Sequence, residues 1–304
     1  MTSGLLLVDK PQGVTSHDIV ARARRLLGTR KVGHAGTLDP MSTGLLLLGV
    51  DSSTRLLTYL VGLDKEYTAT IRLGEATDTD DAEGEIVERH DASHLADAQI
   101  AAGIATLTGP IEQVPSTFSA IKVDGRRAYD RARAGEQVEL TARPVVIRAF
   151  DVLQQRREGD AIDVDVRVVC TSGTYIRALA RDLGRHLEVG GHLTALRRTE
   201  VGPFSVTDGV TLPDPRADPD AAERFEGAAA LLDPADVASR LFPVLRLDAD
   251  TARDLAHGKR VEVDAPDSDV VAALTPDGRL AALVELRRGR ARVLLGLPTQ
   301  EVLP

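Results

Sequence analysis

The sequence predicts an α+β fold with a larger N-terminal part and a small β-rich C-terminal part. Residues 67–73 and 162–170 alternate apolar and polar side chains, which is the period of a half-buried strand. Apolar residues recur at helical spacing in residues 19–27 and 174–187, which predicts two amphipathic helices. After Pro243, short apolar runs alternate with Pro and Gly turns, as in a small all-β domain.

The first elements are expected to be a strand, a helix, a loop and a second strand. Residues 4–10 form a short apolar run that predicts a buried strand. Ser16 is expected to cap the next helix, and Gly28 to end it. A glycine-rich loop at residues 33–44 should lead into a strand at residues 45–50.

The middle of the chain continues with helices and strands. Ser53 is expected to cap a second helix, and residues 95–108 have a helical pattern. Residues 145–152 and 162–170 are predicted strands. Between the helical pattern at residues 95–108 and the strand at residues 145–152, residues 114–139 are polar, basic and weakly periodic. This is compatible with an insertion that closes over a ligand.

The last third of the chain divides into a connector and a strand-rich segment. Residues 207–240 are rich in Asp, Pro and Ala, a composition typical of a surface connector. We therefore predict a catalytic domain at residues 1–240 and a second domain at residues 243–304. The strands expected in the second domain are residues 261–263, 270–274, 280–286 and 291–295.

Charge alone argues against a nucleic-acid partner, because the formal net charge is −9 and nucleic-acid-binding domains are usually basic. The charge is unevenly distributed, however. Residues 75–91 are strongly acidic, whereas residues 122–133 and 176–198 carry an excess of arginine and lysine. An acidic exterior with a locally basic face is compatible with RNA.

Several classes of protein are disfavoured by composition. The single cysteine, Cys170, rules out an intrachain disulfide framework and a cysteine-based zinc site. The seven histidines lack the close spacing of a His-rich metal site. The N-terminus has no signal-peptide pattern, and no apolar run is long enough to span a bilayer, so we expect a cytoplasmic protein without a membrane partner.

Residues 33–44 are the densest candidate for a functional segment. Three glycines and Pro40 lie within twelve residues and predict a tight, unusual backbone path. Because Asp39 precedes Pro40, its carboxylate should lie on a turn and not on a helix. An Asp-Pro pair is often only a turn former, and the spacing matches neither common phosphate-binding glycine motif.

Three further residues are candidates, although ordinary priors favour a structural explanation for each. Tyr67 lies in an alternating strand, and Leu196 lies in a mostly apolar one, so each could simply be a core residue. Arg177 lies in the first turn of a predicted helix, where the helix dipole disfavours a cation. That placement suggests a specific carboxylate or phosphate partner, although an ordinary surface arginine is the alternative.

Taken together and in this order, the segments resemble the TruB family of tRNA pseudouridine synthases. The resemblance covers residues 1 to about 205 and implies a pseudouridine synthase fold. In that fold a mixed, mainly antiparallel central sheet is flanked by helices, and a PUA-like RNA-binding domain follows. The 114–139 segment would be a thumb that grips the T-loop. The matching segments are Gly4–Pro11, Lys31–Pro40, Asp64–Tyr67, Thr77–Gly84, Gly173–Arg177, Gly191–Leu193 and Leu196–Arg198.

The resemblance also implies a reaction and its participants. The N-glycosidic bond of a T-arm uridine, position 55 of tRNA, is broken, the base rotates, and the ribose is rejoined to C5 without a cofactor or metal. Asp39 would be the nucleophile, paired with Arg177, and Tyr67 would stack on the base and assist proton loss at C5. Whether Asp39 attacks C6 of the base or C1′ of the ribose stays open. The residues expected to bind substrate are His34, which would fill the space left by the flipped base, Tyr175, Leu196, Lys10, Arg126, Arg127 and Arg197.

Two other functions fit parts of the sequence. A non-catalytic RNA-binding protein could use the same fold, and a tRNA-folding role is also compatible with the enzyme. A hydrolase of small glycosides would need a second carboxylate about 5–9 Å from Asp39, and the Asp39 motif offers none. No feature indicates an obligate protein partner or dimer, and a monomer is expected.

Overall fold

The computed structural model describes residues 3–116, 122–123, 126–127, 140–218, 220–227 and 229–302. Most of the predicted thumb, residues 114–139, lies outside the described residues. Within it, the backbones of β8 (Lys122–Val123) and β9 (Arg126–Arg127) form a short antiparallel pair.

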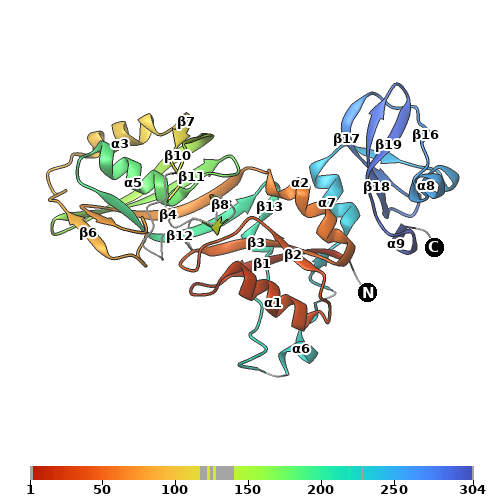
Figure 1. The fold of residues 1–304 in the computed structure, drawn as a ribbon, viewed down its shortest axis with the longest axis horizontal. Helices are drawn as coiled ribbons and strands as arrows, with labels where there is room; N and C mark the ends of the chain where they lie inside the picture. The colour runs from red at the N-terminus through yellow and green to blue at the C-terminus, as the bar shows by residue number, and fades with distance from the viewer. Residues whose placement is uncertain are drawn as a thin grey trace.

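A ten-stranded sheet organises the larger part of the chain (Figure 1). Of its described pairings, only β12 with β3 is parallel, which confirms the expected mixed and mainly antiparallel sheet. The strands across the sheet are β14 (Leu231–Leu232), β1 (Gly4–Lys10), β3 (Thr43–Val50), β12 (Gly191–Val201), β4 (Lys65–Leu73), β11 (Ala161–Cys170), β10 (Arg143–Glu158) and β7 (Gly109–Gln113), with β2 (Val32–Ala35) on β3 and β13 (Phe204–Ser205) on β12.

The strands β1 and β3 are buried on both faces, which explains why their sequences are continuous apolar runs. Leu5 and Leu7 of β1 pack into a core shared with the C-terminal sheet. Leu6 and Val8 pack on the other face, against α1 (Ser16–Leu26). This pair of strands therefore holds the N-terminal helix and the C-terminal part on opposite sides of one sheet.

The strands β4 and β11 alternate between buried and half-exposed side chains, as the sequence predicted. Their buried face carries Tyr67 and packs with Ile176 and Leu179 of α5 (Ile176–His186). The helix α3 (Asp97–Thr106) contributes Ile100 to the same core. The start of α5 and the loop that carries Leu38 and Met41 therefore pack into the same core as Tyr67.

Two of the predicted helix caps were wrong. Thr15, and not Ser16, caps α1, because its side chain bonds the backbone of Asp18 while Asp18 bonds back in a capping box. Ser53 lies inside a 3₁₀ helix, residues Asp51–Leu56, that runs into α2 (Leu57–Val61) without a side-chain cap. The glycine-rich loop also begins later than expected, because residues 32–35 form β2.

The small β-rich part is a five-stranded sheet, which confirms the predicted strands. Its strands in order are β15 (Val244–Arg246), β17 (Ser268–Leu274), β18 (Leu280–Arg287), β19 (Arg290–Gly296) and β16 (Val261–Glu262), with helices α8 (Ala249–Ala256) and α9 (Thr299–Val302). Figure 1 shows this sheet to one side of the larger one, with α7 (Pro234–Leu241) between them.

The predicted connector, residues 207–240, is more ordered than its composition suggested. Residues Leu231–Leu232 pair with β1 as β14, and Val237 of α7 is fully buried in the core shared by both sheets. The short helix α6 (Ala221–Arg224) also belongs to this segment. The acidic and proline-rich composition reflects helix caps such as Asp233 before Pro234.

A separate two-stranded hairpin, β5 (Glu75–Thr77) with β6 (Ile86–Arg89), carries the acidic segment. Among the described residues, no helix combines the length and the apolar character needed to cross a membrane.

Candidate active site

Asp39 lies on a β-turn, as the sequence predicted. The backbone N–H of Ser42 donates to the carbonyl of Asp39 at 3.1 Å, and Pro40 occupies the second position of this turn. Proline favours that position because its φ is already set for the turn. The turn ends a loop, residues 36–42, that we call the Asp39 loop.

The Asp39 loop is fastened to α1 and β1. The Ser16 hydroxyl accepts a hydrogen bond from the Leu38 N–H at 2.9 Å and donates to the Leu38 carbonyl at 3.1 Å. Lys10 is fully buried, and its ammonium donates to the carbonyls of Val14 at 2.8 Å and Pro40 at 3.4 Å. The backbone on both sides of Asp39 is therefore fixed before any substrate arrives.

Arg198 holds the other end of the loop. Its guanidinium is buried and donates to the carbonyls of Leu45 at 2.7 Å, Gly36 at 3.1 Å and Thr37 at 3.4 Å. These three carbonyls come from the loop and from the strand that follows it. A single side chain on β12 therefore sets the distance between the Asp39 loop and the sheet.

The close approach of β12 to the loop depends on Gly44. Its φ is +100°, and a Cβ at this position would lie 2.2 Å from the Arg198 carbonyl oxygen.

We expect Gly44→Ala to lower the free energy of unfolding by more than about 2 kcal/mol, through backbone strain and steric clash together. Gly13→Ala is the control, since Gly13 has φ +82° and nothing within 4 Å of its Cβ position. If urea denaturation shows that Gly44→Ala and Gly13→Ala lose the same free energy of unfolding, the clash with the Arg198 carbonyl does not contribute.

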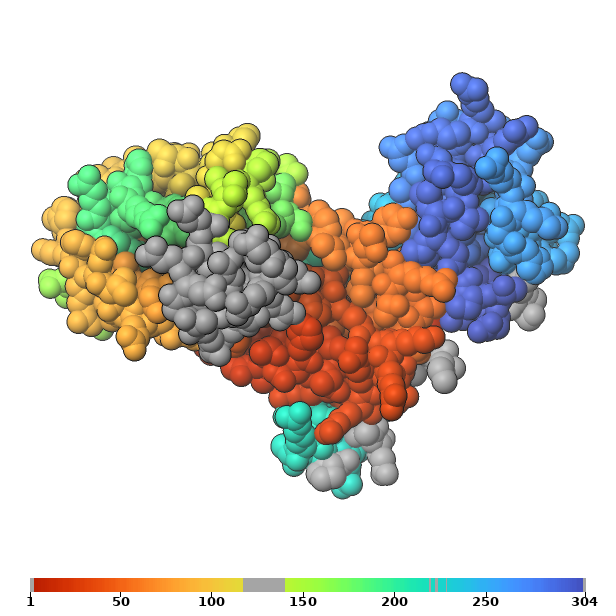
Figure 2. Space-filling view, in the orientation of Figure 1, coloured from red at the N-terminus to blue at the C-terminus, as the bar shows by residue number. Residues whose placement is uncertain are grey.

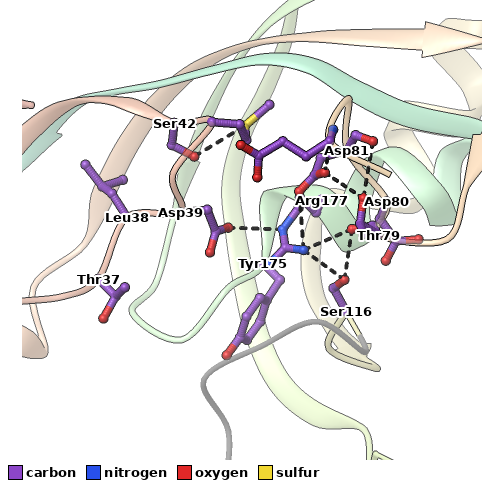
Figure 3. A network of polar contacts seen from close by, with 12 residues as sticks. Thr37, Leu38, Asp39, Ser42, Thr79, Asp80, Asp81, Ser116, Tyr175 and Arg177 are labelled. Atoms are coloured by element: carbon purple, nitrogen blue, oxygen red, sulfur yellow. Dashed lines mark hydrogen bonds and ion pairs between the residues drawn. The ribbon is translucent and has the colours of Figure 1, made fainter. Parts of the chain in front are cut away.

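Arg177 binds Asp39 from the opposite side (Figure 3). Its Nε lies 3.0 Å from Asp39 Oδ2, so the expected ion pair is present. The same guanidinium lies 3.4 Å from Asp81 Oδ2 and donates to the Thr79 carbonyl at 2.9 Å and to Ser116 Oγ at 3.2 Å. Only about 4% of the Arg177 side chain is exposed, against 38% of the Asp39 side chain. The arrangement holds a charged carboxylate that a substrate can still reach.

A cavity of about 250 Å³ opens beside this ion pair, lined by Asp39, Tyr67, Tyr175, Arg177 and Leu196. Typical ligand pockets are larger, ~300–1,000 Å³. The cavity therefore has room for a small planar group and not for an RNA duplex. Asp39 supplies its carboxylate, Tyr67 an aromatic ring and Leu196 an apolar surface.

The acid–base state of Tyr67 follows from its position. Burial raises the pKa of its phenol, and the nearby Arg198 guanidinium offsets that effect only in part. Tyr67 is therefore neutral at physiological pH in the free protein.

Lys65 lines the same cavity and was not predicted as a site residue. Its ammonium donates to the carbonyls of Leu63 at 2.6 Å and Val61 at 3.0 Å. Burial lowers the pKa of Lys65 to about 8 from 10.5. Below pH 8 the lysine is protonated in both the folded and unfolded states, whereas between pH 8 and 10.5 the folded state loses its proton first.

This lysine predicts a pH-dependent stability. Relative to Lys65→Met, the wild-type protein should gain conformational stability as pH rises above 8, with a slope approaching ~1.4 kcal/mol per pH unit. Urea denaturation of both proteins between pH 7 and 9.5 measures the difference. A stability difference that stays constant or falls with pH would contradict a lowered pKa of Lys65.

Two residues predicted to bind substrate occupy other positions. Lys10 is buried against backbone carbonyls, so it supports the Asp39 loop and has no exposed surface for RNA. Arg197 points to the other face of β12 and forms an ion pair with Asp9 at 2.7 Å, because adjacent strand residues face opposite sides. Direct RNA contact by Lys10 is therefore corrected, whereas RNA binding by Arg197, whose side chain is 39% exposed, stays a prediction. Period-two spacing from Leu196 would have identified Arg198 in place of Arg197.

The other predicted substrate residues are placed as follows. Tyr175 lines the cavity and precedes α5, where its backbone N–H and carbonyl both bond the Gln113 side chain. His34 lies on β2 outside the cavity lining, with its ring 5.5 Å from that of His17. Burial lowers the pKa of His34, which favours a neutral ring. The side chains of Arg126 and Arg127 lie outside the described residues.

The sequence reasoning also missed Asp81 as a partner of Arg177. Asp81 is buried and belongs to the matched segment 77–84. The signal available in the sequence was the unusual density of aspartate there.

The fold is shared with solved structures. The chain matches a structure described as an H/ACA RNP bound to a substrate RNA containing 2′-deoxyuridine, with a TM-score of 0.72 and 25% identity over 99% of this chain and 87% of the other. It also matches a Cbf5-Nop10-Gar1 complex, with a TM-score of 0.72 and 26% identity over the same shares. The chain thus has the expected pseudouridine synthase fold.

Sequence comparisons define the family. Residues 24–176 match the N-terminal domain model of TruB family pseudouridylate synthases. Residues 177–237 match a tRNA pseudouridylate synthase B C-terminal domain, and residues 242–298 match the C-terminal model of tRNA pseudouridine synthase II. The chain belongs to the TruB family of pseudouridylate synthases, which makes it an isomerase.

Two similar relatives cover nearly the whole chain. The tRNA pseudouridine synthase B of Leifsonia xyli subsp. xyli is 60% identical, over 99% of this chain and 98% of the relative. That of Thermobifida fusca is 54% identical, over 96% and 97%.

Proposed function

We propose that the protein converts a uridine in the T-loop of tRNA, position 55, into pseudouridine, with Asp39 as nucleophile. The observation that carries the proposal is the Asp39 carboxylate, held 3.0 Å from Arg177 at the edge of a cavity that also contains Tyr67. The names of the relatives support tRNA as the substrate.

The reaction requires a carboxylate that forms a bond to the nucleotide and then leaves. Attack by Asp39, at C6 of the base or at C1′ of the ribose, allows the bond between C1′ and N1 to break. After the base rotates, a bond forms between C1′ and C5 and the bond to Asp39 breaks. The C5 proton is lost to a base, and N1 gains a proton. Atoms balance, since the product is an isomer of the substrate and Asp39 is regenerated.

Arg177 holds the Asp39 carboxylate in position. Its Nε lies 3.0 Å from Asp39 Oδ2, which fixes that oxygen at the edge of the cavity. Because Arg177 is itself fixed by Asp81, Thr79 and Ser116, it cannot swing away to follow RNA phosphates. We infer that its role is electrostatic and positional.

The target base must leave its stack to reach Asp39. Extrusion costs a few kcal/mol, and stacking on an aromatic ring recovers ~1–3 kcal/mol. Tyr67 supplies the ring, and Leu196 on the adjacent strand adds apolar surface to the same cavity. We propose that the uracil lies between these two side chains.

The two roles of Tyr67, stacking and assisting proton loss at C5, separate in two variants. Tyr67→Phe should keep RNA affinity within about twofold and lower kcat by ~10²–10⁴, if the hydroxyl assists proton transfer. Tyr67→Leu should also raise Kd, because the ring is lost. Filter binding and single-turnover isomerisation measure the two effects. An unchanged kcat in Tyr67→Phe would remove the hydroxyl from the mechanism.

Segments outside the cavity would hold the RNA. We propose that residues 1–240 form the catalytic domain, in which residues 114–139 grip the T-loop, and that residues 243–304 form a PUA-like RNA-binding domain. The uneven distribution of arginine over an acidic chain supports this division of labour.

The function is tested by mapping pseudouridine in an unmodified tRNA transcript after incubation with the protein. We expect one new pseudouridine, at position 55, and none in a transcript with cytidine there. Modification at another arm, or of free uridine without RNA, would contradict the assigned substrate.

A further inference from the structure

A groove outside the cavity carries arginines that the proposed mechanism does not use. It has a volume of about 310 Å³ and lies between α1 and residues 214–216. Arg22, Arg25 and Arg216 line it, and we call it the arginine groove. Figures 1 and 2 show α1 and the segment leading to α6 next to each other on the face toward the viewer.

The charges in this groove are only partly neutralised within the protein. Arg22 pairs with Asp214 at 2.9 Å. Asp18 also lines the groove, and its pKa is lowered first by hydrogen bonds to Thr15 and then by the nearby Arg216 and Arg22 guanidinium groups. Arg25 and Arg216 are exposed, and the structure shows no ion pair for either among the residues it describes. Three arginines and two carboxylates, Asp18 and Asp214, line the groove, so positive charge is in excess there by one.

The helix dipole does not account for this arrangement. Arg25 lies in the last turn of α1, where a cation is favoured by the dipole. Arg216 belongs to a different segment, and no ion pair holds it among the described residues. The groove therefore gathers more arginines than its two carboxylates neutralise, and an anion would balance the excess.

The geometry connects the groove to the Asp39 loop. Ser16, at the start of α1, bonds Leu38 directly. Arg22 and Arg25 follow Ser16 by six and nine residues, which places them about 9 and 14 Å along the helix axis. A nucleic-acid strand covers that distance in about three to four nucleotides at ~3.4 Å each.

We propose that the arginine groove binds the phosphodiester backbone of the RNA, within three to four nucleotides of the target uridine. Guanidinium groups bind phosphate oxygens through two parallel hydrogen bonds, and two of them here are available for that contact. The proposal rests on the proposed function for the identity of the RNA. It adds a second anchor, on the α1 side of the cavity.

The test uses the full-length protein and a synthetic T-arm hairpin. Arg25→Ala with Arg216→Ala removes two charges, and each contact should contribute ~0.7 to the slope of log affinity against log salt. We expect the slope to fall by about 1.4, and Kd at 0.1 M salt to rise by roughly 20-fold. The isomerisation rate at saturating protein should stay within twofold of wild type, since neither residue lines the cavity.

The matched control is Arg89→Ala with Arg156→Ala. Both arginines are exposed and lie on β6 and β10, so this variant loses the same net charge away from the groove. A groove variant with the Kd and salt slope of this control would overturn the proposal. Thermal melting confirms folding, which should be retained because the groove substitutions break no ion pair among the described residues.

The same assay separates this proposal from the function. If wild-type protein binds the hairpin but forms no pseudouridine, the proposed function fails while the binding data still decide the groove. If wild type forms pseudouridine and the groove variant binds like the control, only the groove proposal fails.

Discussion

Asp39→Asn should abolish pseudouridine formation while leaving RNA binding nearly intact. The amide keeps the shape of the side chain and loses the negative charge that attacks the nucleotide. Loss of a nucleophile typically costs ~10⁴–10⁶ in kcat. We therefore expect no detectable product within many wild-type turnover times and a Kd within about threefold of wild type.

The control for this variant is Asp9→Asn. Asp9 pairs with Arg197 on the face of the sheet away from the cavity, so its loss should leave kcat within a fewfold of wild type. Product is quantified by nucleoside mass spectrometry after RNA digestion, with binding measured in parallel. Substantial pseudouridine formation by Asp39→Asn would show that Asp39 is not the nucleophile and that another residue catalyses the reaction.

Arg177→Met should damage both stability and catalysis, for separate reasons. The substitution leaves Asp81, whose side chain is about 5% exposed, as a buried carboxylate without its cation. Removing one partner of a buried pair costs ~3–5 kcal/mol. Asp39 also loses the guanidinium that orients it, and a preorganised charge of this kind contributes ~10²–10³ in rate.

A double variant separates the two effects. Adding Asp81→Asn to Arg177→Met removes the stranded charge, so it should restore part of the lost free energy of unfolding, on the order of 1–2 kcal/mol. Activity should stay low, because Asp39 still lacks Arg177. Urea denaturation and single-turnover rates measure the two quantities. Recovery of activity together with stability would mean that Arg177 acts only as a structural residue.

The features that the sequence predicted well are local ones. The alternation in residues 67–73 fixed the buried face that carries Tyr67, and Pro40 placed Asp39 on a turn. The apolar runs of β1 and β3 indicated burial on both faces, although not what covers each face. Local patterns report the period of an element and its turns, and these follow from neighbouring residues.

The features that were missed depend on contacts between distant residues. Arg198 bonds Gly36 across 162 positions, and Ser16 bonds Leu38 across 22. Nothing in the sequence near Ser16 distinguishes a helix cap from a residue that fastens a loop. Lys10 was likewise predicted to bind substrate, since its three carbonyl partners lie in segments that only the folded chain brings together.

Of two adjacent arginines, the sequence analysis selected Arg197, whereas Arg198 lines the cavity. Both are arginines on the same strand, and the one that faces the cavity is set by the alternation of side chains. Counting in twos from Leu196 selects Arg198. The role of Arg198, which is to hold the carbonyls of the Asp39 loop, requires the tertiary structure.

A structure of Asp39→Asn bound to the T-arm hairpin would test the proposed mechanism most directly. We expect the uracil of the target uridine outside its stack, in the cavity between Tyr67 and Leu196. Either C6 or C1′ should lie within ~3.5 Å of the substituted side chain, the spacing of a near-attack geometry. A target base that stays stacked in the hairpin, or RNA bound on a face remote from this cavity, would contradict the mechanism.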